Sequence, residues 1–365
     1  MRTDKKITAF QLYMMLMLFI GISNHVLLIP VLLSTAKRDS WIGAAAAILP
    51  ALLWVALLYV TIRTTDRKKL TDWLHQRYGI VPGAILRFVL IVYFAIVGFV
   101  SLLDTITWTQ VTYLPRTPRL AIALALLLVC WFAAKRGIRA IAVTSGILLP
   151  GVVFLGYMVA SANLQYKDYS LLFPLFTHGY TSALNAMGYT CGALFELTIV
   201  LFLQQHVSNK IRPASLIVMC FIIVGLTLGP LTGSLAIFGP FESAYQRYPA
   251  FEQWRMVTMG KFISHVDFFS IYQWIAGAFV RVSLSLFLIG DIAGVRKPRN
   301  GTVLQTWLCL LFLAGMLIPF SDASLLEFLQ KWFFPGEFVL HLVLTVSLLI
   351  FALLPAGRRK ESSAP

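Results

Sequence analysis

Residues 9–34 read AFQLYMMLMLFIGISNHVLLIPVLLS, an apolar run with Gly21, Ser23, Asn24 and His25 near its centre. The run exceeds the roughly 20 residues that a helix needs to cross the hydrocarbon core of a bilayer. Glycine is about 1 kcal/mol less favourable than alanine inside a helix. Because unwound backbone is tolerated at membrane depth only where it faces protein or a cavity, this stretch predicts a spanning helix that is broken near mid-depth.

A second interruption of this kind lies within residues 182–205, where positions 188–192 read GYTCG. At 1.5 Å per helical residue, Gly21 lies about 18 Å from the inner face and Cys191 about 13 Å from the outer face. Both therefore lie near the middle of a core about 30 Å thick. Freed amides and carbonyls at such breaks can hold the amine and the carboxylate of a small zwitterion.

These two breaks define a predicted ligand site, to which Tyr93 is added because its helix carries it to a similar depth. The predicted ligand-binding residues are Gly21, Ser23, Asn24, Tyr93, Gly188, Tyr189, Cys191 and Gly192. The alternative is that the glycines and small polar residues serve close packing between helices, and that Tyr93 belongs to the packed core.

The rest of the chain has the composition of a membrane protein. Of its 365 residues, 59% are hydrophobic and 12% are charged, whereas a soluble domain carries about 25% charged residues. We predict an all-α membrane protein with about ten transmembrane helices in a single membrane domain, residues 1–365. The candidate helices lie at about 9–34, 41–62, 83–113, 119–134, 140–161, 182–205, 213–238, 267–290, 302–320 and 336–354.

The net charge of +15 is explained by topology rather than by nucleic-acid binding, because Lys and Arg fall in short clusters between apolar segments. With the N-terminus inside, 20 basic residues lie in segments predicted to be cytoplasmic and 9 in segments predicted to be outside. Positive charge favours the cytoplasmic side of a membrane. Both termini are therefore predicted to be cytoplasmic, as an even number of helices also requires.

The ten candidate helices divide into two halves of five, at about 9–161 and about 182–354. An odd number of helices in each half inverts the second half relative to the first, so the broken helices 1 and 6 become counterparts. This is the 5+5 inverted repeat of LeuT-like transporters. Beyond the last helix, residues 358–365 form a short polar tail.

Glu196 and Arg281 are ionisable residues inside two of the predicted helices, and both lie about 21 Å deep. Buried charges in a membrane usually face the bundle interior and have a partner. Opposite charges at one depth predict an ion pair, either a gate or coupling element or a static structural pair. Asp104 is predicted to lie in a wet position near the outer interface, and Asp291 to be solvated beside the basic cluster 296–299.

Two segments between the candidate helices are predicted to be structured. Residues 66–78 place apolar side chains at helical spacing among charges and predict a short amphipathic helix on the inner surface. The outer segment 239–266 places Phe251, Trp254 and Val257 similarly. The four cysteines are read as small buried residues without metal or disulfide spacing. Since there is no catalytic motif, we expect no enzyme activity and no cofactor.

An ordered set of short motifs resembles the spore germination permease family, the B subunits of spore germinant receptors within the amino acid/polyamine/organocation superfamily. Gln11 precedes the first break, and Asp39 with Trp41-Ile42 resembles the family's D-x-W-I. Tyr248-Pro249 with Glu252 and Arg255 resembles its Y-P-x-x-E-x-x-R, and Phe262 and Asp267 then lead to Trp274. The chain departs from the family at Ser264-His265, where Glu-Arg is common, and at Asn24-His25.

The resemblance implies a germinant sensor with the 5+5 fold, which binds an amino acid-like ligand at the broken helices. It implies an A subunit and a lipoprotein C subunit as partners, and the inner spore membrane as the location. The alternative from the same fold is a secondary transporter that moves an amino acid with H⁺ or Na⁺, because fold does not settle function.

Overall fold

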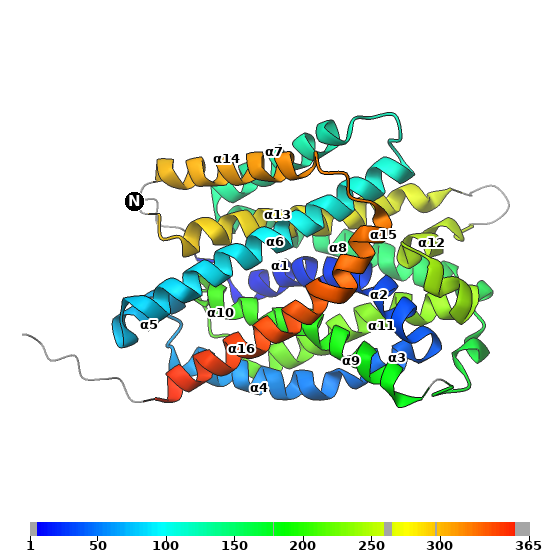
Figure 1. Ribbon diagram of the computed structural model, residues 1–365, viewed down its shortest axis with the longest axis horizontal. Helices are drawn as coiled ribbons and strands as arrows, with labels where there is room; N and C mark the ends of the chain where they lie inside the picture. The colour runs from blue at the N-terminus through cyan, green and yellow to red at the C-terminus, as the bar shows by residue number, and fades with distance from the viewer. Residues whose placement is uncertain (1–5, 178, 259–264, 296–297, 355–365) are drawn as a thin grey trace, which may run out of the picture.

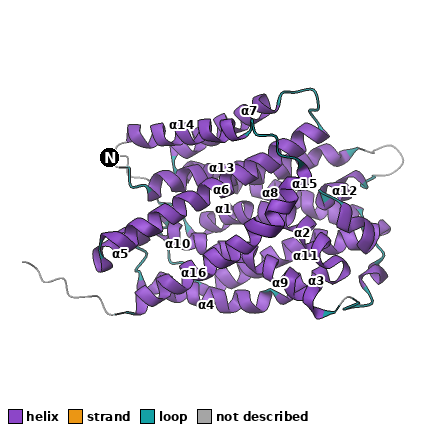
Figure 2. Ribbon diagram, in the orientation of Figure 1, coloured by secondary structure: helices purple, strands orange, loops and turns teal. Residues whose placement is uncertain are grey.

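The structure is a computed structural model, and it describes residues 6–177, 179–258, 265–295 and 298–354. The polar tail predicted for residues 358–365 lies outside these ranges. Within them the secondary structure is helical, apart from a single parallel β-bridge between Ile7 and Val207 (Figure 2).

The helices follow the apolar segments of the sequence. The first half contains α1 Ala9–Ile22, the π-helical η1 Ser23–Leu27, α2 Leu28–Ala36, η2 Lys37–Asp39, α3 Ser40–Ala46, α4 Ile48–Thr64, α5 Leu70–Tyr78, α6 Ile80–Thr112, α7 Arg119–Arg136, α8 Ile138–Ala162, η3 Leu164–Tyr166 and η4 Tyr169–Leu172. The second contains α9 Tyr180–Phe195, the 3₁₀ segment η5 Glu196–Ile199, α10 Val200–Leu203, η6 Gln204–His206, α11 Pro213–Tyr245, α12 Pro249–Arg255, η7 Val266–Phe268, α13 Phe269–Ile292, α14 Pro298–Gly315, α15 Asp322–Phe328, the π-helical η8 Leu329–Phe333 and α16 Phe334–Leu353.

The long helices run along the longest axis of the molecule, with α5 at one end and α12 at the other (Figure 1). α13 packs against α1, α6, α7 and α8, and α9 packs against α2, α3 and α16. The apolar stretches that hold α9 and α13 are each 83% buried, whereas the other candidate spans are 28–50% buried. These two helices therefore form the centre of the bundle, and the others turn apolar faces outward.

Seven helical stretches in the described ranges are long and apolar enough to cross a membrane. One of them, Ala9–Thr64, has 56 residues and holds two of the candidate helices, 9–34 and 41–62. The candidates 119–134 and 302–320 are helical, as α7 and α14, but are not among the seven. The chain is thus an integral multi-pass membrane protein, and the count of ten spanning helices stays a prediction.

The first predicted break is a change of helix type rather than an unwound segment. α1 continues into the π-helix η1 at Ser23 and returns to α geometry at Leu28. A π-turn inserts a residue without losing the helix axis and often marks a functional position.

The second predicted break, at residues 188–192, was placed wrongly. α9 runs as a regular α-helix through Phe195, and the departure from α geometry begins at Glu196 with the 3₁₀ segment η5. Two glycines in five residues were not enough to unwind the helix, because tertiary packing overrides a propensity penalty of about 1 kcal/mol each.

Both structured segments outside the candidate helices are confirmed as helices. α5 buries Leu70, Trp73 and Leu74, and α12 forms in the outer segment. Phe251, Trp254 and Val257 are buried in an apolar cluster with Trp108 and Trp274, whose rings stack with centroids 4.0 Å apart.

Candidate functional site

The centre of the bundle holds a buried ionic cluster around Arg281 of α13. Its Nη1 donates to Glu196 Oε2 at 2.7 Å and to the Phe19 carbonyl oxygen at 2.8 Å. Arg281 and Glu196 are both 0% exposed, and the guanidinium lies 4.7 Å from the centre of the Phe19 ring. Two charges that were predicted to share a depth therefore meet, and Arg281 joins α1 to the start of η5.

A second carboxyl group belongs to the same cluster. Glu337 of α16 is 3% exposed, and its Oε1 lies 3.8 Å from Arg281 Nη2. The Tyr93 hydroxyl of α6 lies 3.0 Å from Glu196 Oε1 and 3.5 Å from Glu337 Oε1. His341, one turn beyond Glu337, places Nε2 3.1 Å from the same hydroxyl. We call these five residues, Glu196, Arg281, Glu337, Tyr93 and His341, the central cluster.

The end of α1, just before the π-helix, offers a backbone acceptor to Arg281. The Ser23 amide donates to the Ile20 carbonyl, which leaves the Phe19 carbonyl to accept from the guanidinium. The Asn24 side chain donates to the Ile20 carbonyl at 3.2 Å and accepts from the Thr227 hydroxyl at 3.3 Å. The irregular segment of helix 1 is therefore tied by side chains to α13 and α11.

Ser23, the first residue of η1, has a buried hydroxyl. Its side chain is 0% exposed, and its Oγ has no hydrogen-bond partner among the described residues. A buried hydroxyl without a partner costs free energy, so it is a candidate for contact with a bound polar molecule. η1 also packs against α9, and α1 packs against η5, so each irregular segment lies against the α-helix that leads into the other.

The glycines of the predicted site divide into two kinds. A side-chain carbon added at Gly192 would lie 2.6 Å from the Phe334 carbonyl oxygen of α16, and one at Gly21 would lie 3.2 Å from the Leu226 side chain. Both positions thus serve close packing, as in the alternative interpretation. At Gly188 nothing lies within 4 Å. On the same helix Cys191 is buried, whereas Tyr189 is half-buried beside the core.

Asp104 was predicted to be wet, and this was wrong. It is 1% exposed and forms an ion pair with Arg247, which also lies 3.8 Å from Asp322. Tyr248 donates its hydroxyl to Asp322 at 3.0 Å. Burial and the nearby Asp104 carboxylate raise the pKa of Tyr248, so it acts as a neutral donor. These contacts tie α6, the segment before α12 and the start of α15.

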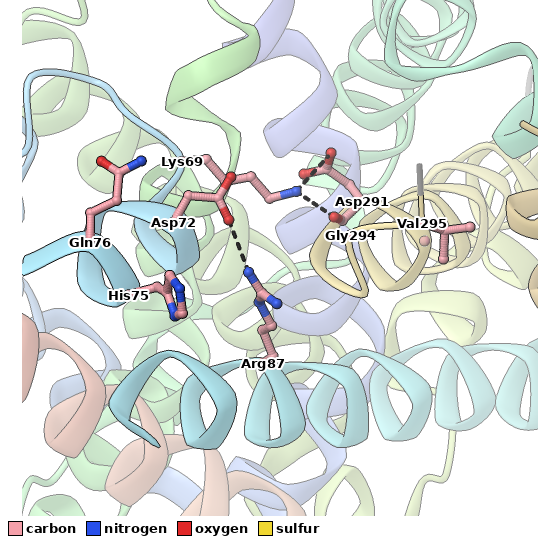
Figure 3. A pocket seen from close by; sticks show the side chains of 9 residues that line it. Lys69, Asp72, His75, Gln76, Arg87, Asp291, Gly294 and Val295 are labelled. Carbon is pink, nitrogen blue, oxygen red and sulfur yellow. Dashed lines mark hydrogen bonds and ion pairs between the residues drawn. The ribbon is translucent and has the colours of Figure 1, made fainter. Parts of the chain in front are cut away.

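Asp291 was expected to be solvated beside the basic cluster 296–299, where residues 296 and 297 lie outside the described ranges. Instead its side chain is 20% exposed and lies 3.5 Å from Lys69 Nζ and 3.4 Å from His206 Nε2. The contact with Lys69 borders a pocket of ≈ 590 Å³, in which Asp72 also pairs with Arg87 (Figure 3). This end of α13 is therefore tied to the N-cap residue of α5, Lys69, and to η6.

Glu337 and His341 are the site residues that sequence reasoning missed. Both lie in the last candidate helix, 336–354, and ionisable residues inside an apolar span usually mark function. Their spacing of four residues places them on one face of a helix. This signal was present in the sequence, although nothing in it connected the face to Arg281.

The comparisons with known proteins agree with this architecture. A family profile described as spore germination protein matches residues 6–318. Spore germination protein XB of Bacillus anthracis is 38% identical over 353 residues, covering 96% of this chain and 99% of that protein. The putative spore germination protein YfkT of Bacillus subtilis is 23% identical over 266 residues, or 71% of each chain.

Among solved structures, MhsT in complex with L-phenylalanine is similar, with a TM-score of 0.65 and 11% identity over 97% of this chain and 94% of that one. At this identity the similarity concerns the fold, which is that of LeuT. The family profile and the relative that is 38% identical establish more than the fold. The chain belongs to the spore germination permease family.

Proposed function

We propose that this chain is the germinant-sensing membrane subunit of a spore germinant receptor, and not an enzyme. It binds a small amino acid-like ligand beside η1 and the end of α9, and the bound state is passed to an A subunit and a lipoprotein C subunit in the inner spore membrane. Family membership and the LeuT fold support a transporter-like germination protein. The sensing role is our inference.

One observation carries the proposal. Arg281 Nη1 donates hydrogen bonds to both the Phe19 carbonyl oxygen, in the last turn of α1, and the Glu196 carboxylate at the start of η5. A ligand that binds between helices 1 and 6 therefore acts directly on a link between them. The Ser23 hydroxyl, which has no hydrogen-bond partner within the described ranges, offers this ligand a hydrogen bond.

The test is germination of spores that carry the Ser23→Ala variant in a strain lacking the native gene, screened against single amino acids. The substitution removes only a hydroxyl that has no hydrogen-bond partner among residues 6–177, 179–258, 265–295 and 298–354, so we expect folding to be preserved. We expect the effective germinant concentration to rise about 5- to 30-fold, which corresponds to a lost hydrogen bond of about 1–2 kcal/mol.

Ser145→Ala is the matched control. This serine is also 0% exposed, but its hydroxyl donates to the Ile141 carbonyl within its own helix. It should leave the germinant response unchanged. If the strain without the gene germinates normally with every amino acid, or if Ser23→Ala and Ser145→Ala respond alike, the proposal is wrong.

The second candidate is an amino acid transporter driven by H⁺ or Na⁺, which the LeuT fold itself favours. Uptake of labelled amino acids into proteoliposomes separates the two. Ligand binding without accumulation supports the sensor, whereas accumulation driven by an ion gradient supports the transporter.

A further inference from the structure

The central cluster contains more acid than base. Its charged groups are one guanidinium, Arg281, and two carboxyl groups, Glu196 and Glu337, all at most 3% exposed. If both carboxyl groups were ionised, the cluster would hold an uncompensated negative charge in the middle of the bundle. An isolated charge away from water is disfavoured, and two like charges at one site disfavour each other's ionisation.

The neighbouring helices bring two more titratable groups and no further cation to the cluster within the described ranges. α6 contributes the Tyr93 hydroxyl, and α16 itself contributes His341. α1 contributes the Phe19 carbonyl oxygen and the Phe19 ring, neither of which titrates. A proton on one of the cluster's own residues would balance the excess negative charge.

We infer that Glu337 is a proton-binding site: in the conformation of this structure it holds a proton, while Glu196 remains the ionised partner of Arg281. Glu196 is 2.7 Å from the guanidinium, whereas Glu337 is 3.8 Å from it. Glu337 Oε2 is buried and has no hydrogen-bond partner in the described part of the chain, which suits a neutral carboxylic acid. Tyr93 has one hydroxyl proton, so it cannot donate to both carboxyl groups at once.

His341 is the competing place for this proton. An imidazolium there would add a second cation to the cluster that holds Arg281. It would also carry a buried N–H at Nδ1, an atom without a partner in the described structure. Both features disfavour a charged His341, so we assign the proton to Glu337.

The geometry couples this proton to helix movement. Glu337 lies on α16, Glu196 on η5 and Arg281 on α13. A movement that separates α16 from η5 admits water to Glu337, whose acid O–H bond then breaks to give a carboxylate and a hydrated proton. The inference rests on the proposed function in that the same movement would follow ligand binding, but the proton can be measured without any amino acid.

Infrared spectroscopy of the purified protein in lipid nanodiscs at neutral pH tests the site, because a protonated carboxyl has a C=O stretching band that shifts in D₂O. We expect Glu337→Gln to lose one such band with little change in unfolding temperature, since glutamine resembles the neutral acid. Glu327→Gln removes a carboxyl that is 61% exposed and should lose none.

Glu196→Gln supplies an independent readout. In that variant Arg281 must take Glu337 as its counterion, so the same band should disappear although Glu337 is present. If Glu337→Gln loses no band, or unfolds because it needed the charge, the inference is overturned. Spores without the gene that germinate normally would remove the sensing role but leave the band in place, so the two failures are distinguishable.

Discussion

At the scale of single residues, Glu337 provides a reserve partner for Arg281. Glu196→Gln should lower the free energy of unfolding by only about 1–3 kcal/mol, because Glu337 can ionise and turn to the guanidinium. The double variant Glu196→Gln/Glu337→Gln should lose about 3–5 kcal/mol or more, since Arg281 is then buried without a counterion. Chemical denaturation of the purified single and double variants measures the free energy of unfolding of each. The loss in the double variant should exceed the sum of the losses in the two single variants.

The matched control for this comparison of single and double variants is Glu196→Gln combined with Glu327→Gln, a surface glutamate that forms an ion pair with the exposed Lys331. Its two effects should add. If the losses of unfolding free energy caused by Glu196→Gln and Glu337→Gln also added, Glu337 would not act as a counterion of Arg281.

The sequence predicted the pair but not the cluster. Glu196 and Arg281 were found because each is a lone ionisable residue at the same depth in an apolar helix. Depth carries no lateral information, so neither Glu337 nor the Phe19 carbonyl could be assigned to Arg281. The exposure of Asp104 was predicted wrongly for the same reason. Its partner Arg247 lies 143 positions away in the sequence, and only the tertiary fold brings the two side chains into contact.

At the scale of elements, the contact between α9 and α16 positions the central cluster. Gly192 lies one turn before Glu196, and the Phe334 carbonyl that it meets lies three residues before Glu337. Gly192→Leu should force α16 away, lower the free energy of unfolding by about 1–3 kcal/mol and abolish germination. Thermal unfolding and the spore response measure the two effects.

Gly188→Leu is the control on the same helix, because nothing lies within 4 Å of that position. We expect its stability to stay within about 0.5 kcal/mol of the wild type. Equal losses at the two positions would show that helix propensity, and not the contact with Phe334, decides the result.

Helix irregularities were the least predictable elements. Glycine content correctly marked helix 1 but placed the change in helix 6 several residues too early, since the 3₁₀ segment begins at Glu196. Glycine reports where a helix is weak or closely packed, whereas the site of the distortion depends on tertiary partners. At Asn24 the partner comes from α11, and at Glu196 the partners come from α13 and α6.

At the scale of the whole molecule, the length of the apolar segments predicted where the helices lie. The distribution of Lys and Arg predicts the orientation of these helices in the membrane. In a variant without the four native cysteines, Lys68→Cys should react with a membrane-impermeant thiol reagent only from the cytoplasmic side. Tyr245→Cys, at a position that is 88% exposed, should react only from outside. Labelling of position 68 from outside would contradict the predicted topology.

Hydrogen exchange of the purified protein in nanodiscs tests most directly whether a small ligand acts through the centre of the bundle. The probe is a mixture of the twenty protein amino acids, added to the wild type and to Ser23→Ala, and the segment followed is 196–206. We predict that the mixture changes exchange in this segment of the wild type and that Ser23→Ala needs a higher concentration for the same change. Unaltered exchange in the wild type at saturating amino acid concentrations would contradict an amino acid ligand between helices 1 and 6.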